Sequence, residues 1–355
     1  MPRRRDLLKL GGALALGGAF AVSSHAAPMT PATDLDPMSL VDPELRPFAR
    51  QMQAYSANAA PLSLKTLPRL RAMLTNSIPA PSTAVPFETR RVPVGRDQPD
   101  VLVYIVNAKP GGSRPGILHT HGGGFVAGDA KSALRNAQNV AAALDCTVVT
   151  VDYRLAPETR YLGSIEDNYA GLRWLYGHAA ELGVDPKRIA VMGESAGGGH
   201  AALLAIVARD RGEVPLIFQS LTYPMLDDRT GSTRTPPKHI GTLVWTAGAN
   251  QFGWRSFLGL EPGRARAPAA AVPARVENLR GLAPAFIGVG SLDLFADEDL
   301  EYARRLVAAG VPTEFHLVPG AFHAFDSVEA ATVSRRYNSA KLDALRRAFG
   351  LPISV

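Results

Sequence analysis

The sequence has a single cysteine, Cys146, among its 355 residues. A chain with one cysteine cannot form an internal disulfide, so packing and hydrogen bonds alone have to stabilise its fold. Cys146 begins the apolar stretch 146–151, which predicts a buried thiol without a nucleophilic role. Charged residues make up only 20% of the chain and hydrophobic residues 46%, a composition that excludes a disordered protein and predicts a large core.

Three further absences restrict the function. No group of histidine, cysteine and carboxylate residues has the spacing of a metal site, and we expect neither a metal nor a cofactor. The net charge of +6 is not gathered into a basic stripe with interleaved aromatic residues, which argues against a nucleic-acid partner. No apolar run reaches the roughly 20 residues that cross a bilayer, so we expect no stable membrane anchor.

Residues 1–26 predict a signal peptide. Three arginines at 3–5 precede a Gly/Ala/Leu stretch at 10–22, and small residues follow at 24–27, as in exported proteins. The segment RRDLLK at 4–9 resembles a twin-arginine (Tat) signal. An ordinary secretory (Sec) signal is the alternative. Either route predicts an exported bacterial protein, periplasmic or secreted.

The rest of the chain divides at about residue 86. Residues 27–86 contain two amphipathic helical patterns, at 43–59 and 63–76, which we interpret as helices that lie on a larger domain. From residue 87 strands and helices alternate, and this predicts a mostly parallel α/β sheet covered by helices on both faces. The expected strands are 87–94, 101–107, 116–120, 146–151, 188–192, 216–220, 285–289 and 313–318. The expected helices are 131–144, 165–182, 196–209, 297–309 and 331–349.

The interval between Pro224 and Pro284 interrupts this alternation. About sixty residues are too many for an ordinary connection in a compact domain. The interval is rich in aromatic residues and predicts a helical lid inserted into the domain 87–355.

The pentapeptide Gly193-Glu194-Ser195-Ala196-Gly197 predicts the nucleophile. It follows an apolar strand and opens a helical stretch, the strand-turn-helix context of a nucleophile elbow. Glycines flank the serine because a Cβ at either position would crowd the tight turn. We expect the helix N-terminus to favour negative charge that develops near the Ser195 hydroxyl.

A serine hydroxyl needs a base, and His323 is the best placed of the eight histidines. It lies in a short loop after the last expected strand, from which it can reach the carboxyl edge of the sheet. The others lie in the signal segment, in expected helices or strands, in the insertion or beside the third strand: His25, His119, His121, His178, His200, His239 and His316.

The histidine in turn needs an acceptor that fixes its tautomer. Asp293 follows the strand 285–289 at the same edge and gives the chain order Ser, Asp, His of α/β hydrolases. Asp297 is the competing carboxylate, and we interpret it instead as the N-cap of the next helix.

The glycine-rich segment His121-Gly122-Gly123-Gly124 follows the third strand. Glycines allow backbone N–H groups to approach a substrate, and we expect Gly122, Gly123 and Ala196 to form an oxyanion hole. His121 is expected to shape this loop through hydrogen bonds. The segment lacks the spacing of a phosphate-binding loop.

With these motifs the chain resembles the hormone-sensitive-lipase family of microbial α/β-hydrolase serine esterases. The resemblance rests on five ordered segments: HGGG at 121–124, DYRLAPE at 152–158, GESAGG at 193–198, Asp293 within 291–298, and His323 followed by Phe325. It implies an α/β-hydrolase fold with an eight-stranded sheet, one strand antiparallel, and a helical cap built from the N-terminal helices and the insertion at about 224–284. Glu194 stands where many relatives have Asp, which we expect to alter only a supporting hydrogen bond.

The resemblance also implies the hydrolysis of small carboxylic esters with short to medium acyl chains. Amidase, lactonase and deacetylase activities share the chemistry and are alternatives; a non-catalytic ligand receptor on the same fold is a remote one. We interpret the segment 152–158 as a brace for the sheet. Trp245, Phe252, Trp254 and Phe325 are candidates for lining the acyl pocket. A monomer and a homodimer are both consistent with the sequence.

Overall fold

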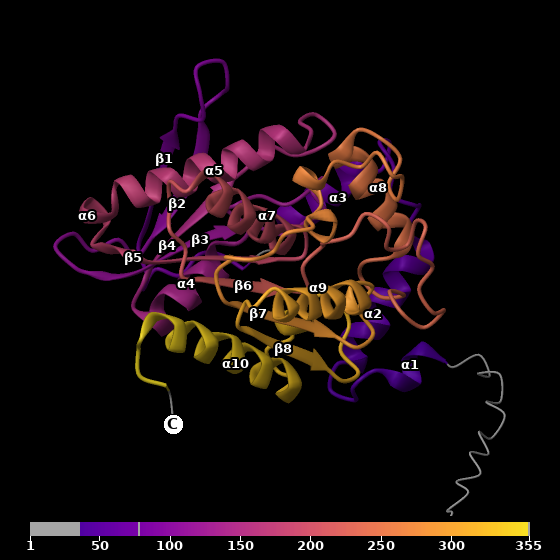
Figure 1. Ribbon diagram of the computed structural model, residues 1–355. Helices are drawn as coiled ribbons and strands as arrows, with labels where there is room; N and C mark the ends of the chain where they lie inside the picture. Colours follow the sequence, from indigo (N-terminus) through magenta and orange to yellow (C-terminus); the bar gives the residue numbers. More distant parts are fainter. Residues whose placement is uncertain (1–35, 77–78, 354–355) are drawn as a thin grey trace, which may run out of the picture. The chain divides into compact units, whose positions relative to one another are not determined.

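Eight strands form one sheet in the order β1-β2-β4-β3-β5-β6-β7-β8 (Figure 1). Only β2 runs antiparallel to its neighbours, and every pair from β4 to β8 is parallel. This confirms the predicted mostly parallel sheet with one antiparallel strand. The strands are β1 (Phe87–Val92), β2 (Val101–Val106), β3 (Arg114–Thr120), β4 (Thr147–Asp152), β5 (Val184–Glu194), β6 (Phe218–Thr222), β7 (Ala285–Gly290) and β8 (Thr313–Val318).

This computed structural model describes residues 36–76 and 79–353. The signal peptide expected at 1–26 lies outside the described residues. Within them, no helix is both long enough and apolar enough to span a bilayer.

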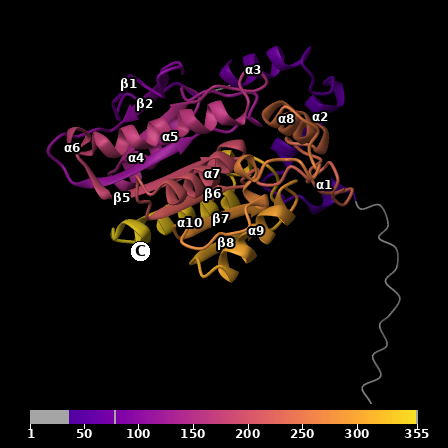
Figure 2. The same ribbon diagram turned by 45° about the horizontal axis from the view of Figure 1, so that its top comes forward.

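Helices cover both faces of the sheet (Figures 1 and 2). Packed on one face are α4 (Leu134–Leu144) and α10 (Thr332–Phe349), and on the other α5 (Tyr161–Gly177), α7 (Ala196–Arg211) and α9 (Ala296–Ala308). Every residue of β6 and β7 is buried, because both faces of the central strands meet a helical layer. This explains why β7 is a continuous apolar run instead of an alternating pattern.

Two expected elements differ most from the structure, and most of the others differ by one to four residues at an end. The strand expected at 188–192 is longer, since β5 begins at Val184 and a register shift between Arg114 and Gly116 of β3 accommodates the Asp185-Pro186 pair. The helix expected at 165–182 is two helices, α5 and the short α6 (Ala179–Leu182). Its α-helical course is interrupted at His178, whose φ of −106° and ψ of 16° are not helical.

Three further helices lie at the end of the sheet to which the parallel strands point (Figure 2). They are α2 (Arg46–Asn58) and α3 (Leu67–Asn76), which follow the single-turn α1 (Pro37–Leu40), and α8 (Ala247–Leu258) from the interval 224–284. Phe48 of α2 stacks on Phe322, with ring centroids 6.0 Å apart. Phe257 of α8 stacks on Phe125 at 4.0 Å.

The rest of the interval 224–284 has two short 3₁₀ turns, Ala269–Ala271 and Pro273–Arg275, joined by irregular chain. Two adjacent buried carboxylates tie it together. Asp228 pairs with Arg275 at 2.6 Å and also accepts from the Gly263 N–H. Asp227 pairs with Arg229 and Arg234. Paired buried charges specify a geometry that an irregular backbone cannot specify by itself.

Candidate active site

Ser195 lies in the tight turn between β5 and α7. Its φ of 57° and ψ of −124° are unusual for a residue with a side chain, and such strain is typical of a nucleophile elbow. Hydrogen bonds to the last residue of β6 and to the chain after it fix the turn. The Ser195 N–H donates to the Thr222 carbonyl at 2.9 Å, and the Ser195 carbonyl accepts from the Met225 N–H. A Cβ on Gly197 would overlap the carbonyl of Thr120, so the flanking glycine is required by close approach.

The structure brings Ser195, His323 and Asp293 together. The Nε2 of His323 is 2.9 Å from the Ser195 Oγ, and its Nδ1 is 2.9 Å from Oδ2 of Asp293. The Asp293 side chain is fully buried and that of His323 is 7% exposed. An acceptor on Nδ1 favours the tautomer with the proton there, which leaves Nε2 free to accept the serine proton.

Asp293 has a second function at the start of α9, where its Oδ1 accepts from the Phe295 N–H at 3.0 Å. The prediction that Asp297 caps this helix is wrong. The cap residue is Phe295, and Asp297 lies exposed in the first turn. The helix begins one residue earlier than expected because the Asp293 carboxylate already receives a backbone N–H ahead of it.

The glycine-rich segment packs directly against Ser195. A Cβ on Gly122 would lie 3.4 Å from the Ser195 Cβ and 3.1 Å from the Glu194 carbonyl. Gly123 and Gly124 have φ of 127° and 62°, a region that favours glycine. Among the described residues, the N–H groups of Gly122, Gly123 and Ala196 have no hydrogen-bond acceptor, so these donors are available to a ligand.

His121 lies beneath this loop. Its Nδ1 is 2.9 Å from the Gly122 carbonyl, and its ring stacks on Tyr153 with centroids 4.1 Å apart. The Tyr153 hydroxyl donates to the His121 carbonyl at 2.7 Å. Burial lowers the pKa of His121, which keeps the ring uncharged and suits it to a structural hydrogen bond.

The segment 152–158 forms hydrogen bonds and ion pairs with several other parts of the chain, as its interpretation as a brace requires. Asp152 accepts from the Ala130 N–H at 2.9 Å, and Arg154 forms a forked pair with the buried Asp167. Glu158 pairs with Arg71 of α3.

Glu194 directly precedes Ser195, and two side chains hold its carboxylate. Its Oε2 is 2.8 Å from the His119 Nε2, and its Oε1 accepts from the Asn136 side chain at 3.1 Å. Burial by itself would raise the pKa of Glu194, but His119 and the hydrogen bonds lower it below its ordinary value. The carboxylate therefore stays ionised in the protein interior. His119 was not singled out from the sequence, because its position inside a strand gave no sign of this partner.

The four aromatic candidates for the pocket separate into two groups. Trp254 and Phe325 are completely buried, and their role in lining the pocket stays a prediction. Trp254 packs on Phe125 and Phe257, and Phe325 on Tyr337. Trp245 is buried, with 8% of its surface exposed, and Phe252 is partly buried. A Cβ on Gly124 would overlap the Trp245 ring.

Tyr223, which follows β6, is a residue that sequence reasoning missed. Its ring centroid lies 4.5 Å from that of His323. The available signal was its position immediately after a buried strand, at the same sheet edge as Ser195.

A parallel sheet with a serine in a strained strand-to-helix turn at its carboxyl edge defines the α/β-hydrolase class. A family model described as alpha/beta hydrolase fold matches residues 117–327. Esterase LipI of Mycobacterium tuberculosis is 41% identical over 212 residues, which are 59% of this chain and 65% of LipI. Carboxylesterase NlhH of the same species is 36% identical over 255 residues, 68% of this chain and 72% of NlhH.

Solved structures agree with this assignment. A structure named Bacterial Heroin Esterase has a TM-score of 0.80 and 36% identity, covering 88% of this chain and 99% of that one. Esterase LipW from Mycobacterium marinum has a TM-score of 0.75 and 33% identity, covering 88% and 97%. The chain belongs to the hormone-sensitive-lipase-like family of α/β-hydrolases, a family of carboxylic ester hydrolases, and this confirms the resemblance seen in its motifs.

Proposed function

We propose that the protein cleaves small carboxylic esters with Ser195 as nucleophile, His323 as general base and Asp293 as the residue that orients the histidine. The observation that carries the proposal is the continuous hydrogen-bonded chain from the Ser195 Oγ through both ring nitrogens of His323 to Asp293, with two links of 2.9 Å.

The reaction runs in two halves. Ser195 Oγ attacks the ester carbonyl carbon while His323 Nε2 takes its proton, and a tetrahedral oxyanion forms. His323 then gives that proton to the departing alcohol oxygen, the carbon–oxygen bond of the ester breaks, and an acyl-serine remains. Water attacks this acyl group with His323 again as base, and release of the carboxylic acid restores the serine.

The N–H groups of Gly122, Gly123 and Ala196 are proposed to hold the oxyanion. Their lack of partners among the described residues supports this role. One such donor contributes on the order of 10² to 10³ in rate, because it is aimed in advance at charge that appears only in the transition state.

We propose substrates with short to medium acyl chains. The names of the relatives, esterase and carboxylesterase, support ester substrates. The Trp245 ring over Gly124 supports a short chain, since it occupies space beside the proposed oxyanion hole. Amides, lactones and acetylated sugars or amines would use the same serine chemistry, and a substrate panel ranks them.

We further propose that α2, α3 and the interval 224–284 form a cap over the site, and that the protein is exported through the signal at 1–26. Phe48 and Phe257 contact the domain at the carboxyl edge of the sheet, which supports the cap. The twin-arginine-like segment supports export. A homodimer is proposed from the edge strand β8, whose outer backbone groups have no neighbouring strand in the described sheet.

Labelling with a fluorophosphonate tests the nucleophile. The wild-type protein is expected to react once, at Ser195, and Ser195→Ala is expected to lose both labelling and the turnover of p-nitrophenyl acetate while it keeps the wild-type circular dichroism spectrum. Turnover that persists in Ser195→Ala would remove the serine from its role. A wild-type protein that binds esters without reacting would indicate a receptor.

A further inference from the structure

His323 lies in a loop, and a loop histidine needs restraints to hold its ring in line with both partners. The Asp293 bond restrains only one ring atom. The loop runs from the end of β8 at Val318 to the start of α10 at Thr332 and contains a single 3₁₀ turn, Phe325–Ser327. The Phe295 ring meets the imidazole edge-on, with centroids 5.4 Å apart, and additional contacts directly after the histidine restrain the loop.

Tyr223 restrains the loop from the neighbourhood of the nucleophile. Its ring lies against the imidazole at 4.5 Å, and its hydroxyl donates to Oδ1 of Asp326 at 2.5 Å. Asp326 is three residues beyond His323 in the same loop. The Tyr223 N–H donates to the carbonyl of Gly288 on β7 at 2.6 Å, so the tyrosine is anchored to the sheet and not to the loop it holds.

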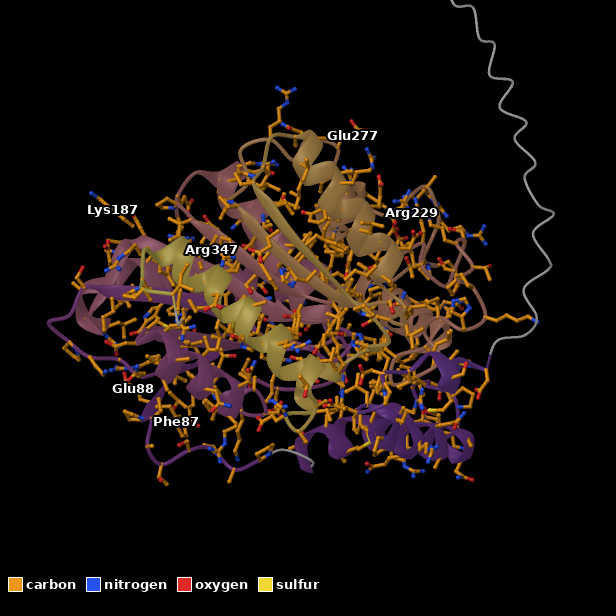
Figure 3. The ribbon with its side chains drawn as sticks, turned by 90° about the horizontal axis from the view of Figure 1, so that it is seen from below. Phe87, Glu88, Lys187, Arg229, Glu277 and Arg347 are labelled. Atoms are coloured by element: carbon orange, nitrogen blue, oxygen red, sulfur yellow. The ribbon has the colours of Figure 1, made fainter. Side chains whose placement is uncertain are left out.

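Helix α10 restrains the same loop from the other side. Ser334 and Asn338 donate to the carbonyls of Phe325 and Asp326 at 2.6 and 2.9 Å. Lys341 Nζ lies 3.9 Å from Oδ2 of Asp326. These positions recur at helical spacing, so one face of α10 is directed at this loop. In Figure 3 α10 lies across the sheet, and Arg347, labelled on its C-terminal half, pairs with Glu314 of β8.

Asp326 and Lys341 are both largely buried, so each of their charges needs a partner. Their side chains are only 13% and 4% exposed, and an unpaired charge is costly at such a depth. The Lys341 ammonium lies beside the Asp326 carboxylate, and this carboxylate is the acceptor for the Tyr223 hydroxyl. Burial, followed by the Asp326 charge, raises the pKa of Tyr223 well above its ordinary value, so the hydroxyl keeps the proton that it donates.

We propose that Tyr223 and Asp326, backed by Lys341, are positioning residues that hold the His323 imidazole in line with Ser195 and Asp293. The inference rests on the proposed function of that triad. Because these residues act through the histidine and not on the substrate, their loss should lower kcat and the rate of serine phosphonylation and leave KM unchanged.

The test compares Tyr223→Phe, Asp326→Asn and the double variant with Tyr169→Phe. Tyr169 is the matched control, since it is another buried tyrosine whose hydroxyl donates to a carboxylate. Its acceptor is Glu213, 44 positions later in the sequence, at 3.0 Å. Tyr223→Phe removes one hydroxyl and keeps the ring. Measurements are kcat and KM for p-nitrophenyl acetate, the fluorophosphonate labelling rate and the thermal midpoint.

We expect Tyr223→Phe to lower kcat and the labelling rate by about 10-fold to 10²-fold with KM unchanged, and Tyr169→Phe to leave both rates as in the wild type. The double variant should lose no more than the worse single variant, because both break one interaction. If Tyr223→Phe does not fold, the fluorophosphonate labelling rate of Asp326→Asn tests the inference instead.

Wild-type rates in Tyr223→Phe, losses that multiply in the double variant, or a loss found only in KM would overturn the inference. The proposed function fails separately, in a wild-type protein that the fluorophosphonate does not label.

Discussion

The indole ring of Trp245 lies against Gly124, so that a Cβ added to this glycine would overlap it. The two residues come from the interval 224–284 and from the glycine-rich segment, and their contact joins the proposed cap to the proposed oxyanion hole. The indole N–H donates to the buried Asn250 side chain at 3.2 Å, which holds the ring in this position.

We therefore expect Gly124→Ala to displace the glycine-rich segment and to lower kcat for p-nitrophenyl acetate on the order of 10²-fold, the effect of misplacing one oxyanion donor. Gly111→Ala is the matched control, since Gly111 also has a positive φ, 81°, but its Cβ would meet nothing within 4 Å. Equal losses of activity in the two variants would contradict a specific role for the contact with Trp245.

Asp293→Asn should lower kcat on the order of 10⁴-fold with little change in KM, because an amide can hold His323 in the wrong tautomer. Asp297→Asn serves as the control, as this carboxylate is exposed four residues further on. If Asp297→Asn caused the larger loss in steady-state assays, the assignment of the acid would be wrong.

Arg71 of α3 donates to the carbonyls of Val126 and Ala156, at 2.8 and 3.1 Å, and pairs with Glu158. Arg71→Ala is expected to lower the free energy of unfolding by about 1–2 kcal/mol, mainly through the two carbonyls. Glu158→Gln should cost less than about 1 kcal/mol, since this carboxylate is 61% exposed and exposed pairs contribute little. Urea unfolding measures both, and a larger loss in Glu158→Gln would contradict this division.

Asp299 predicts a pH dependence of stability. It is fully buried, neither carboxylate oxygen has a hydrogen-bond partner among the described residues, and burial, reinforced by Glu298 and Asp293, raises its pKa well above the ordinary value. An unfolded aspartate titrates near pH 3.9, as in peptides. The folded protein keeps this proton to higher pH, so its contribution to stability is full below about pH 4 and is lost as pH rises through the folded pKa.

The Asn side chain of Asp299→Asn has no titrating proton, so this variant should not lose stability with rising pH through residue 299. The difference in unfolding free energy between wild type and variant is expected to shift in favour of the variant with rising pH, by at most about 1.4 kcal/mol per pH unit. Urea titrations between pH 4 and 8 measure the slope. Asp297→Asn, on the same turn but exposed, should keep the wild-type slope, and a parallel change in both variants would refute the assignment.

Cys146 should be inert in the folded protein. It is completely buried, and this burial raises the pKa of its thiol to about 12. Iodoacetamide at pH 8 is expected to leave esterase activity unchanged and to alkylate Cys146 only after unfolding, because the thiolate is the reactive form. Rapid alkylation of the native protein, followed by mass spectrometry, would show that the thiol is accessible.

The fold was largely predictable because a parallel sheet buried on both faces requires continuous apolar strands. The strand expected at 285–289 corresponds to β7, which is one residue longer and buried throughout. The site residues could be proposed for a related reason, since the carboxyl ends of parallel strands share one edge and Ser195, Asp293 and His323 each follow a strand. The local difference in β5 arose from a bulge, which depends on the partner strand and leaves no mark in the strand's own pattern.

Tertiary contacts account for the remaining differences. Nothing in the local sequence distinguishes Trp254, which packs into the core, from Trp245, which lies on the glycine-rich segment. The pairing of Tyr223 with Asp326 joins residues 103 positions apart. No periodicity reports such a pair, because each residue looks ordinary in its own segment.

Ser195 and His323 are separated by 128 positions, and this distance has a consequence for biosynthesis. In a nascent chain that has just emerged beyond residue 195, the Ser195 hydroxyl has no base beside it and is a weak nucleophile. On the proposed mechanism its hydroxyl is activated only after the chain through His323 has left the ribosome and the loop between β8 and α10 has docked. Translation products that stop before His323 would therefore have no esterase activity inside the cell that makes them.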